Sequence, residues 1–191
     1  MVETWRVQRR RLQAYLVAFA LLLAVPSATA RAGAGGRVRL TVWKSRREMV
    51  LVADGRVVRR FRIALGSVPS GTKRLEGDGR TPVGHYRIVE KRPSRRFRWF
   101  LGIDYPNGVD ADRGYALGLI GPGEWADIFL AHLRGQRPPW TTALGGQIGI
   151  HGAGGRPAEV DWTEGCIAVS DAEIDYLAAH VPLGTVVEIL P

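Results

Sequence analysis

Two short stretches, IGIHG at 148–152 and TEGCIAVS at 163–170, carry the residues on which the interpretation of this 191-residue chain depends. The first is an apolar run that ends at His151, and it predicts a buried strand with an imidazole at its end. The second places Cys166, the only cysteine in the chain, between a glycine and an apolar run that predicts another strand. The loop between the two stretches can bring the imidazole and the thiol together.

A cysteine beside a histidine can act as a nucleophile. Because an ordinary thiol has a pKa of about 8.5, it needs a neighbouring base to become a thiolate at neutral pH. Gly165 would let a carbonyl substrate approach the backbone, and the N–H groups of Gly165 and Cys166 are candidates for binding an oxyanion. Alternatively, Cys166 is a small core residue and His151 a hydrogen-bonded structural residue. The pair alone leaves both interpretations open.

The flanking sequence predicts a mainly β domain with a few short helices. Asp54-Gly55 between alternating apolar runs predicts a hairpin, so the domain is expected to open as an antiparallel meander. Helices are expected at 123–133, from apolar spacing, and after a capping box at Ser170. Strands are expected at 38–43, 49–52, 57–65, 84–89, 99–103, 147–151 and 185–190, and irregular segments at 66–82, 91–98 and 134–146.

Residues 1–30 have the pattern of a secretory signal peptide. A cluster of arginines at 6–11 precedes an apolar run at 14–25, and Ala28-Thr29-Ala30 fits a cleavage site. The apolar run is shorter than the roughly 20 residues that a membrane-spanning helix needs. The alternative is an uncleaved membrane anchor. The predicted organisation is thus a signal peptide at 1–30, a linker at 31–37 and one domain at 38–191.

The net charge and the cysteine count limit the partners, disulfides and metal sites that the chain is expected to have. The chain carries a net charge of +9, which falls to +6 without residues 1–30. For an exported protein without a nucleic-acid recognition motif, this favours an anionic envelope polymer over nucleic acid, and membrane contact only through an uncleaved signal. A single cysteine cannot form an intramolecular disulfide, and with four scattered histidines it gives no metal-ligand spacing. We therefore expect no metal and no cofactor.

Three motifs together resemble a known family. His151-Gly152 followed by TEGC at 163–166 resembles the active-site signature of L,D-transpeptidases of the YkuD type. EGDGRTPVGHYRI at 76–88 is similar to a second segment of that family, and YPNGVD at 105–110 recurs in one of its branches. The resemblance covers 38–190, nearly the whole predicted domain. Within it, the glycines of 76–88 predict a turn scaffold rather than a part of the groove.

The resemblance implies a curved β-sandwich with Cys166 and His151 facing one groove. Cys166 would attack the carbonyl that follows the diaminoacid of a peptidoglycan tetrapeptide stem and expel D-alanine, with His151 as the base. The carbonyl of Gly152 would fix the tautomer of His151, and Thr163 and Gly165 would shape the groove and the oxyanion site. The implied partners are peptidoglycan stem peptides, with an amine of another stem or of an envelope protein as the acyl acceptor, in the periplasm or cell envelope.

Two residues depart from the signature that many members share. Glu164 replaces a histidine and Ala168 replaces an arginine, and DWTEGCIAV at 161–169 is similar to a branch with an Asp-Trp-Thr-x-Gly-Cys-Ile-Ala-Val segment. A negative charge therefore replaces a positive one beside the nucleophile. This leaves open a peptidase or amidase that transfers the acyl group to water. A non-catalytic wall-binding module is the alternative from another class.

Overall fold

The computed structural model describes residues 38–157 and 160–191. Within them, eight strands form one sheet with three helices beside it. The strands are β1 (Arg39–Trp43), β2 (Glu48–Ala53), β3 (Arg56–Arg62), β4 (Gly84–Ser94), β5 (Arg98–Ile103), β6 (Gly149–Gly152), β7 (Ile167–Val169) and β8 (Val186–Leu190). The helices are α2 (Gly108–Ala116), α3 (Pro122–Leu133) and α4 (Asp171–His180).

The predicted signal peptide (1–30) and linker (31–37) lie outside the described residues. No helix in the described part of the chain has the length and apolar character that crossing a membrane requires.

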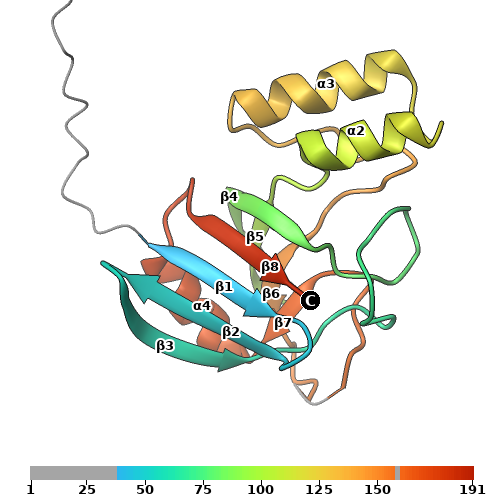
Figure 1. Cartoon of the computed structure of the whole chain (residues 1–191). Coiled ribbons are helices and arrows are strands. Elements are labelled where there is room, and N and C mark those ends of the chain that lie inside the picture. The colour runs from blue at the N-terminus through green and yellow to red at the C-terminus, as the bar shows by residue number, and fades with distance from the viewer. Residues whose placement is uncertain (1–37, 158–159) are drawn as a thin grey trace, which may run out of the picture. The chain divides into compact units, whose positions relative to one another are not determined.

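The sheet bends at β4, so that its two halves fold over a common core. Residues 84–87 pair antiparallel with β8, and residues 88–94 pair antiparallel with β5, with a register shift between Ile88 and Glu90. Irregularities of this kind bend a strand and increase its twist. The strand order is β3-β2-β1-β8-β4-β5-β6-β7 (Figure 1). The predicted mainly β fold, a curved β-sandwich with a few short helices, is confirmed.

The two outer strands of this order, β3 and β7, meet through the segment that follows β3. Ala64 and Ala168 exchange two backbone hydrogen bonds of 2.9 Å. Further along, the N–H of Ser67 donates to the carbonyl of Thr163 at 2.9 Å. The strand β7 and the turn before it are therefore held by β6 on one side and by the segment after β3 on the other.

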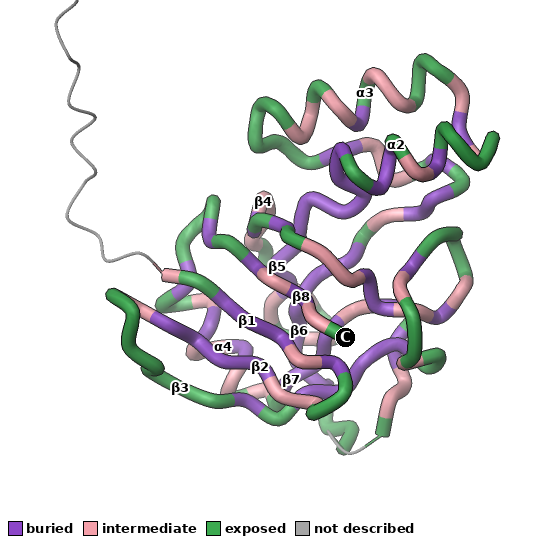
Figure 2. Tube along the Cα trace, in the orientation of Figure 1, coloured by how far each residue is buried: buried purple, intermediate pink, exposed green. Residues whose placement is uncertain are grey.

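Alternating apolar residues of the strands and one face of α4 form the core. Ile174 and Leu177 of α4 are fully buried against the sheet. The capping box predicted at Ser170 is confirmed, since its hydroxyl accepts from the N–H of Glu173 and its N–H donates to the Glu173 carboxylate. Figure 2 shows the buried positions along β1 and β2. The core includes Leu40, Val42, Leu51, Phe61, Tyr86, Ile88, Leu101, Ile103, Ile150, Ile167, Val169, Val187 and Ile189.

The prediction of an irregular segment at 91–98 is wrong. Strand β4 runs to Ser94 and β5 begins at Arg98, so that the two form a hairpin. The ammonium of Lys91 donates to two carbonyls at the end of α4, at 2.6 and 2.9 Å. Tertiary contacts thus provide the hydrogen-bond acceptors for a basic side chain within a strand. The local sequence pattern does not indicate these contacts.

Helix α2 is not predicted, because it begins at a glycine and has no apolar stripe. Asn107 and Asp110 form a reciprocal capping box, with each side chain accepting from the other residue's N–H at 3.0 and 3.1 Å. The buried Asp110 carboxylate also accepts from the hydroxyl of Tyr86 at 3.0 Å and from Arg113 at 2.6 Å. A buried polar network therefore stabilises this helix in place of an amphipathic face.

Gly66 lies where the segment after β3 meets the segments that contain Gly79 and Gly165. A Cβ there would lie 2.1 Å from the carbonyl oxygen of Gly79 and 3.1 Å from the Cα of Gly165. We expect Gly66→Ala to lower the free energy of unfolding by about 1–3 kcal/mol, because the backbone must shift. Gly123→Ala is the control, since nothing lies within 4 Å of that position in α3, and it should be neutral or stabilising. Urea unfolding measures both, and an unchanged midpoint for Gly66→Ala would contradict this packing.

Candidate active site

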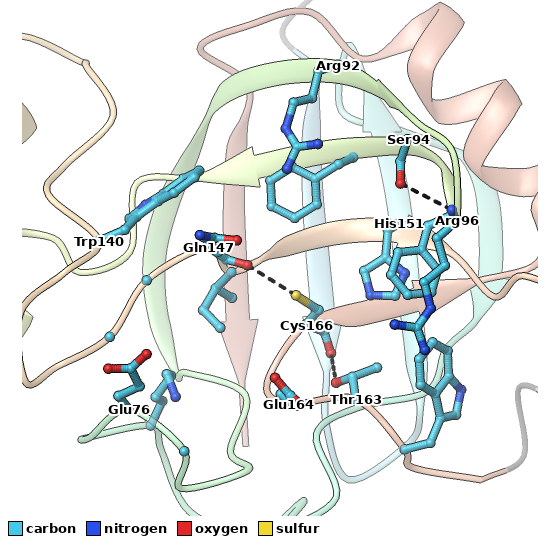
Figure 3. Close-up of a pocket in the computed structure, with 18 of the residues that line it drawn as sticks. Glu76, Arg92, Ser94, Arg96, Trp140, Gln147, His151, Thr163, Glu164 and Cys166 are labelled. Atoms are coloured by element: carbon cyan, nitrogen blue, oxygen red, sulfur yellow. Dashed lines mark hydrogen bonds between the residues drawn. The ribbon is translucent and has the colours of Figure 1, made fainter.

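A cleft of about 710 Å³ opens where β6, the turn before β7 and the β4–β5 hairpin come together. His151 and Cys166 both line it, together with Phe97, Trp140 and Gln147. Figure 3 shows Cys166 between Gln147 and His151. The fold thus brings the two residues singled out in the sequence into one cavity.

His151 is buried on β6 with one ring nitrogen fixed and the other available. Its Nδ1 lies 2.8 Å from the carbonyl oxygen of Gly152. Because a carbonyl can only accept, Nδ1 carries the hydrogen and Nε2 keeps its lone pair. The ring stacks on Phe97 with centroids 4.3 Å apart, and the Trp162 ring lies 5.7 Å away. Burial lowers the pKa of His151 despite the hydrogen bond to Gly152, so the imidazole is neutral at pH 7 and can accept a proton.

The turn that presents Cys166 is held by one threonine. The hydroxyl of Thr163 donates to the carbonyl of Cys166 at 2.7 Å and accepts from the N–H of Gly165 at 3.1 Å. Gly165 has a φ of 128°, and a Cβ there would lie 2.6 Å from the carbonyl oxygen of Arg80. Backbone conformation and space therefore both require glycine before the cysteine.

The Cys166 thiol is protonated at neutral pH. Its Sγ donates to the carbonyl of Gln147 at 3.4 Å. Although the residue keeps part of its surface open to the cleft, burial of the sulfur raises its pKa to about 11. A backbone hydrogen bond from Gly149 and the charge of Lys73 act in the opposite direction, and Glu164 raises the pKa further. The thiol would therefore need a neighbouring base to act as a nucleophile at neutral pH.

Gly152 is fixed between the β4–β5 hairpin and the start of α4. Its N–H donates to the carbonyl of Phe97 at 3.0 Å. A Cβ at this position would lie 2.7 Å from that same carbonyl oxygen and 2.7 Å from Oδ1 of Asp171. Only glycine fits, and its carbonyl is thereby held as the partner of the His151 ring.

The turn at 76–82 is organised by Asp78. Its carboxylate accepts from the N–H groups of Arg74, Leu75 and Arg80 at 2.7, 3.2 and 3.1 Å, and from the buried ammonium of Lys73 at 3.0 Å. Burial opposes ionisation of Asp78, but these hydrogen bonds outweigh it and lower the pKa. The predicted turn scaffold is present, and the carbonyl oxygen of Arg80 packs against Gly165. The expectation that this segment is not a part of the groove is wrong, because Glu76 and Gly77 line the cleft together with Lys73.

Three side chains around His151 were not predicted, namely Arg96, Phe97 and Arg156. They come from the β4–β5 hairpin and from the loop after β6. No motif or periodicity indicates them, because they meet His151 only through tertiary packing. In residues 38–157 and 160–191, no group of three or more His, Cys, Asp or Glu side chains is placed to hold a metal ion.

The model of the YkuD family, the L,D-transpeptidase catalytic domain, matches residues 37–189 of the chain. The chain belongs to the L,D-transpeptidase catalytic domain family. The resemblance noted from the three motifs is thus confirmed over nearly all of the described residues of this YkuD domain.

Solved structures of similar fold include the helical cell shape determining protein Pgp2 from Campylobacter jejuni, with 22% identity, a TM-score of 0.56, and coverage of 82% of this chain and 48% of that one. Bd1075 from Bdellovibrio bacteriovorus has 17% identity and a TM-score of 0.52, covering 84% and 50%. An L,D-transpeptidase from Mycobacterium smegmatis has 14% identity and a TM-score of 0.50, covering 82% and 60%. The YkuD chain therefore spans 48–60% of the length of these proteins, which show the fold alone. A comparison with curated proteins found no match.

The raised thiol pKa predicts an unusual alkylation profile. We expect the rate of Cys166 modification by iodoacetamide to keep rising about tenfold per pH unit up to about pH 10, because the thiolate forms only as the pH approaches 11. The urea-unfolded protein is the internal control, since its single thiol should titrate at about 8.5. Intact-mass kinetics measures both rates. A plateau below pH 8 in the folded protein would indicate a thiolate already paired with an imidazolium.

Proposed function

We propose that this protein is a peptidoglycan L,D-transpeptidase that works through a thioacyl-enzyme on Cys166. The proposal rests on one observation, a partly exposed thiol in the same cleft as a buried, neutral imidazole whose Nδ1–H is directed to the carbonyl of Gly152. Membership of the L,D-transpeptidase family supports peptidoglycan stem peptides as the substrate class.

Thioester formation begins when the Cys166 thiol passes its proton to Nε2 of His151 as the sulfur attacks. The sulfur attacks the carbonyl carbon that follows the diaminoacid at the third position of a tetrapeptide stem. As the C–N bond breaks, His151 passes the proton to the departing nitrogen and D-alanine leaves. Because the thiol pKa is raised, proton transfer accompanies attack rather than preceding it.

The oxyanion of the tetrahedral intermediate needs a hydrogen-bond donor. The N–H of Gly165 already donates to the hydroxyl of Thr163. We therefore assign this role to the N–H of Cys166, with Thr163 and Gly165 fixing its direction.

The thioester is resolved by an amine of another stem or of an envelope protein. His151 takes a proton from the attacking amine and delivers it to the Cys166 sulfur as the C–S bond breaks. Glu164 is exposed beside the nucleophile and Ala168 is buried on β7, so neither provides the positive charge found there in many members. Transfer to water remains the second candidate for this reason, and it would give monomeric stems in place of dimers.

This substrate implies an exported protein of the cell envelope, in line with the signal peptide predicted at 1–30. Pgp2, one of the proteins of similar fold, is described as a helical cell shape determining protein. We propose that the present chain likewise acts in cell-wall organisation and cell shape.

Substitution of either catalytic residue tests the proposal. We expect Cys166→Ala to lower the rate of D-alanine release from a tetrapeptide muropeptide at least about a thousandfold, and His151→Gln to lower it to a similar extent, because the two act as a unit. Mass spectrometry of the muropeptides measures both D-alanine loss and the products.

His180→Gln is the matched control for the histidine. Its Nδ1 also lies 2.8 Å from a backbone carbonyl, that of Tyr176, but on the exposed face of α4 outside the cleft. This variant should keep full activity, and all three should keep the circular dichroism of the parent. D-alanine release by folded Cys166→Ala at the parental rate would refute the proposal.

A further inference from the structure

Two arginines stand at the His151 end of the cleft, each stacked on an aromatic ring. The guanidinium carbon of Arg96 lies 5.0 Å from the centre of the Phe97 ring, and that of Arg156 lies 4.4 Å from the centre of the Trp162 ring. Phe97 in turn stacks on His151 and lies 6.0 Å from Trp162. Stacking leaves the N–H edges of a guanidinium available for an oxyanion.

The backbone brings these two arginines together. A Cβ on Gly154 would lie 2.9 Å from the carbonyl oxygen of Arg96, so the loop after β6 passes directly against the β4–β5 turn. The N–H of Gly154 donates to Asp171 at the start of α4 at 2.9 Å, which holds the loop in place. Arg156 lies on this same loop and Arg96 on that turn.

The carboxylates of the cleft lie at its other end. Figure 3 shows Arg96 beside His151, whereas Glu76 and Glu164 lie on the other side of Cys166. An anionic group that enters the cleft is therefore attracted toward His151 and repelled from the glutamates.

The other cations that line the cleft are already engaged. The ammonium of Lys73 donates to the Asp78 carboxylate and to a backbone carbonyl, and Arg92 pairs with a glutamate of its own strand. Among residues 38–157 and 160–191, no carboxylate lies within ion-pair range of Arg96 or Arg156. These two arginines are therefore the cations best placed to bind an anionic part of a substrate.

We propose that Arg96 and Arg156 bind the free carboxylate of the residue that leaves, so that the site selects peptides ending one residue beyond the bond that is cut. This proposal rests on the proposed function. In a C-terminal residue the carboxylate carbon is two bonds from the nitrogen, and His151 delivers a proton to that nitrogen as the C–N bond breaks. The group that binds the carboxylate must then lie beside His151, where the two arginines are. D-alanine leaves with its carboxylate ionised.

The same arginines act on the base. Burial is the main reason that the pKa of His151 is lowered, and the charges of Arg96 and Arg156 lower it further. A carboxylate bound between them offsets these charges, so the imidazole becomes a stronger base when a substrate occupies the cleft.

Ligand binding to Cys166→Ala protein tests the proposal without turnover. The ligands are a tetrapeptide stem ending in D-alanine and the same peptide with a C-terminal carboxamide, compared by isothermal titration calorimetry. We expect the acid to bind about tenfold more tightly, and Arg96→Gln combined with Arg156→Gln to abolish this preference. Arg59→Gln is the matched control, because Arg59 also stacks on an aromatic ring, that of Tyr176 at 4.5 Å, but outside the cleft.

Equal affinities for the acid and the carboxamide, no detectable binding of either, or a preference that survives the double substitution would overturn the proposal. Failure of the proposed function is a different result, because the wild-type protein would then release no D-alanine whatever the affinities. In a protein that turns over, the double substitution should lower kcat/KM for the acid about tenfold and leave that for the carboxamide within about twofold.

Discussion

The site depends on the meeting of the two outer strands of the sheet at Ala64 and Ala168. Their paired hydrogen bonds hold β7 between β6 and the segment after β3. Two residues further along, a Cβ on Gly66 would lie 2.1 Å from the carbonyl oxygen of Gly79 and 3.1 Å from the Cα of Gly165. A Cβ on Gly165 would itself lie 2.6 Å from the carbonyl oxygen of Arg80. The turn that presents Cys166 is thus fixed by backbone packing on both sides. This is why a thiol can face a cleft on a short turn and still have a defined position.

The electrostatics of the cleft favour uncharged forms of both Cys166 and His151. Burial raises the pKa of the Cys166 thiol and lowers that of His151, so the neutral pair is favoured over thiolate and imidazolium. The carbonyl of Gly152 fixes the imidazole tautomer, as a carboxylate would. Unlike a carboxylate, it adds no charge. A neutral resting pair keeps the partly exposed thiol unreactive, since reactivity follows the thiolate.

Much of the fold follows from local patterns. The Asp54-Gly55 hairpin, the capping box at Ser170 and the strands at 149–152 and 167–169 were predictable from alternation and turn chemistry. The motif also predicted that Cys166 and His151 face one cleft. The strand structure of the 91–98 region was not predictable, because the ammonium of Lys91 finds its hydrogen-bond acceptors at the end of a helix far along the chain. Helix α2 could not be predicted for a similar reason, because buried contacts of Asp110 stabilise it in place of an apolar face. The residues around His151, Arg96 among them, belong to these tertiary arrangements and carry no local signal.

The central claim is that Cys166 carries the acyl group, and the intact mass of the protein after rapid quenching with a tetrapeptide donor tests it most directly. We predict a transient species heavier by the donor less D-alanine, sensitive to hydroxylamine and located on the peptide that contains Cys166. Because the chain has one cysteine, such a thioester is assigned without ambiguity. Release of D-alanine with the acyl group found on another residue, or with no acyl-enzyme at any time point down to the first turnover, would contradict the claim.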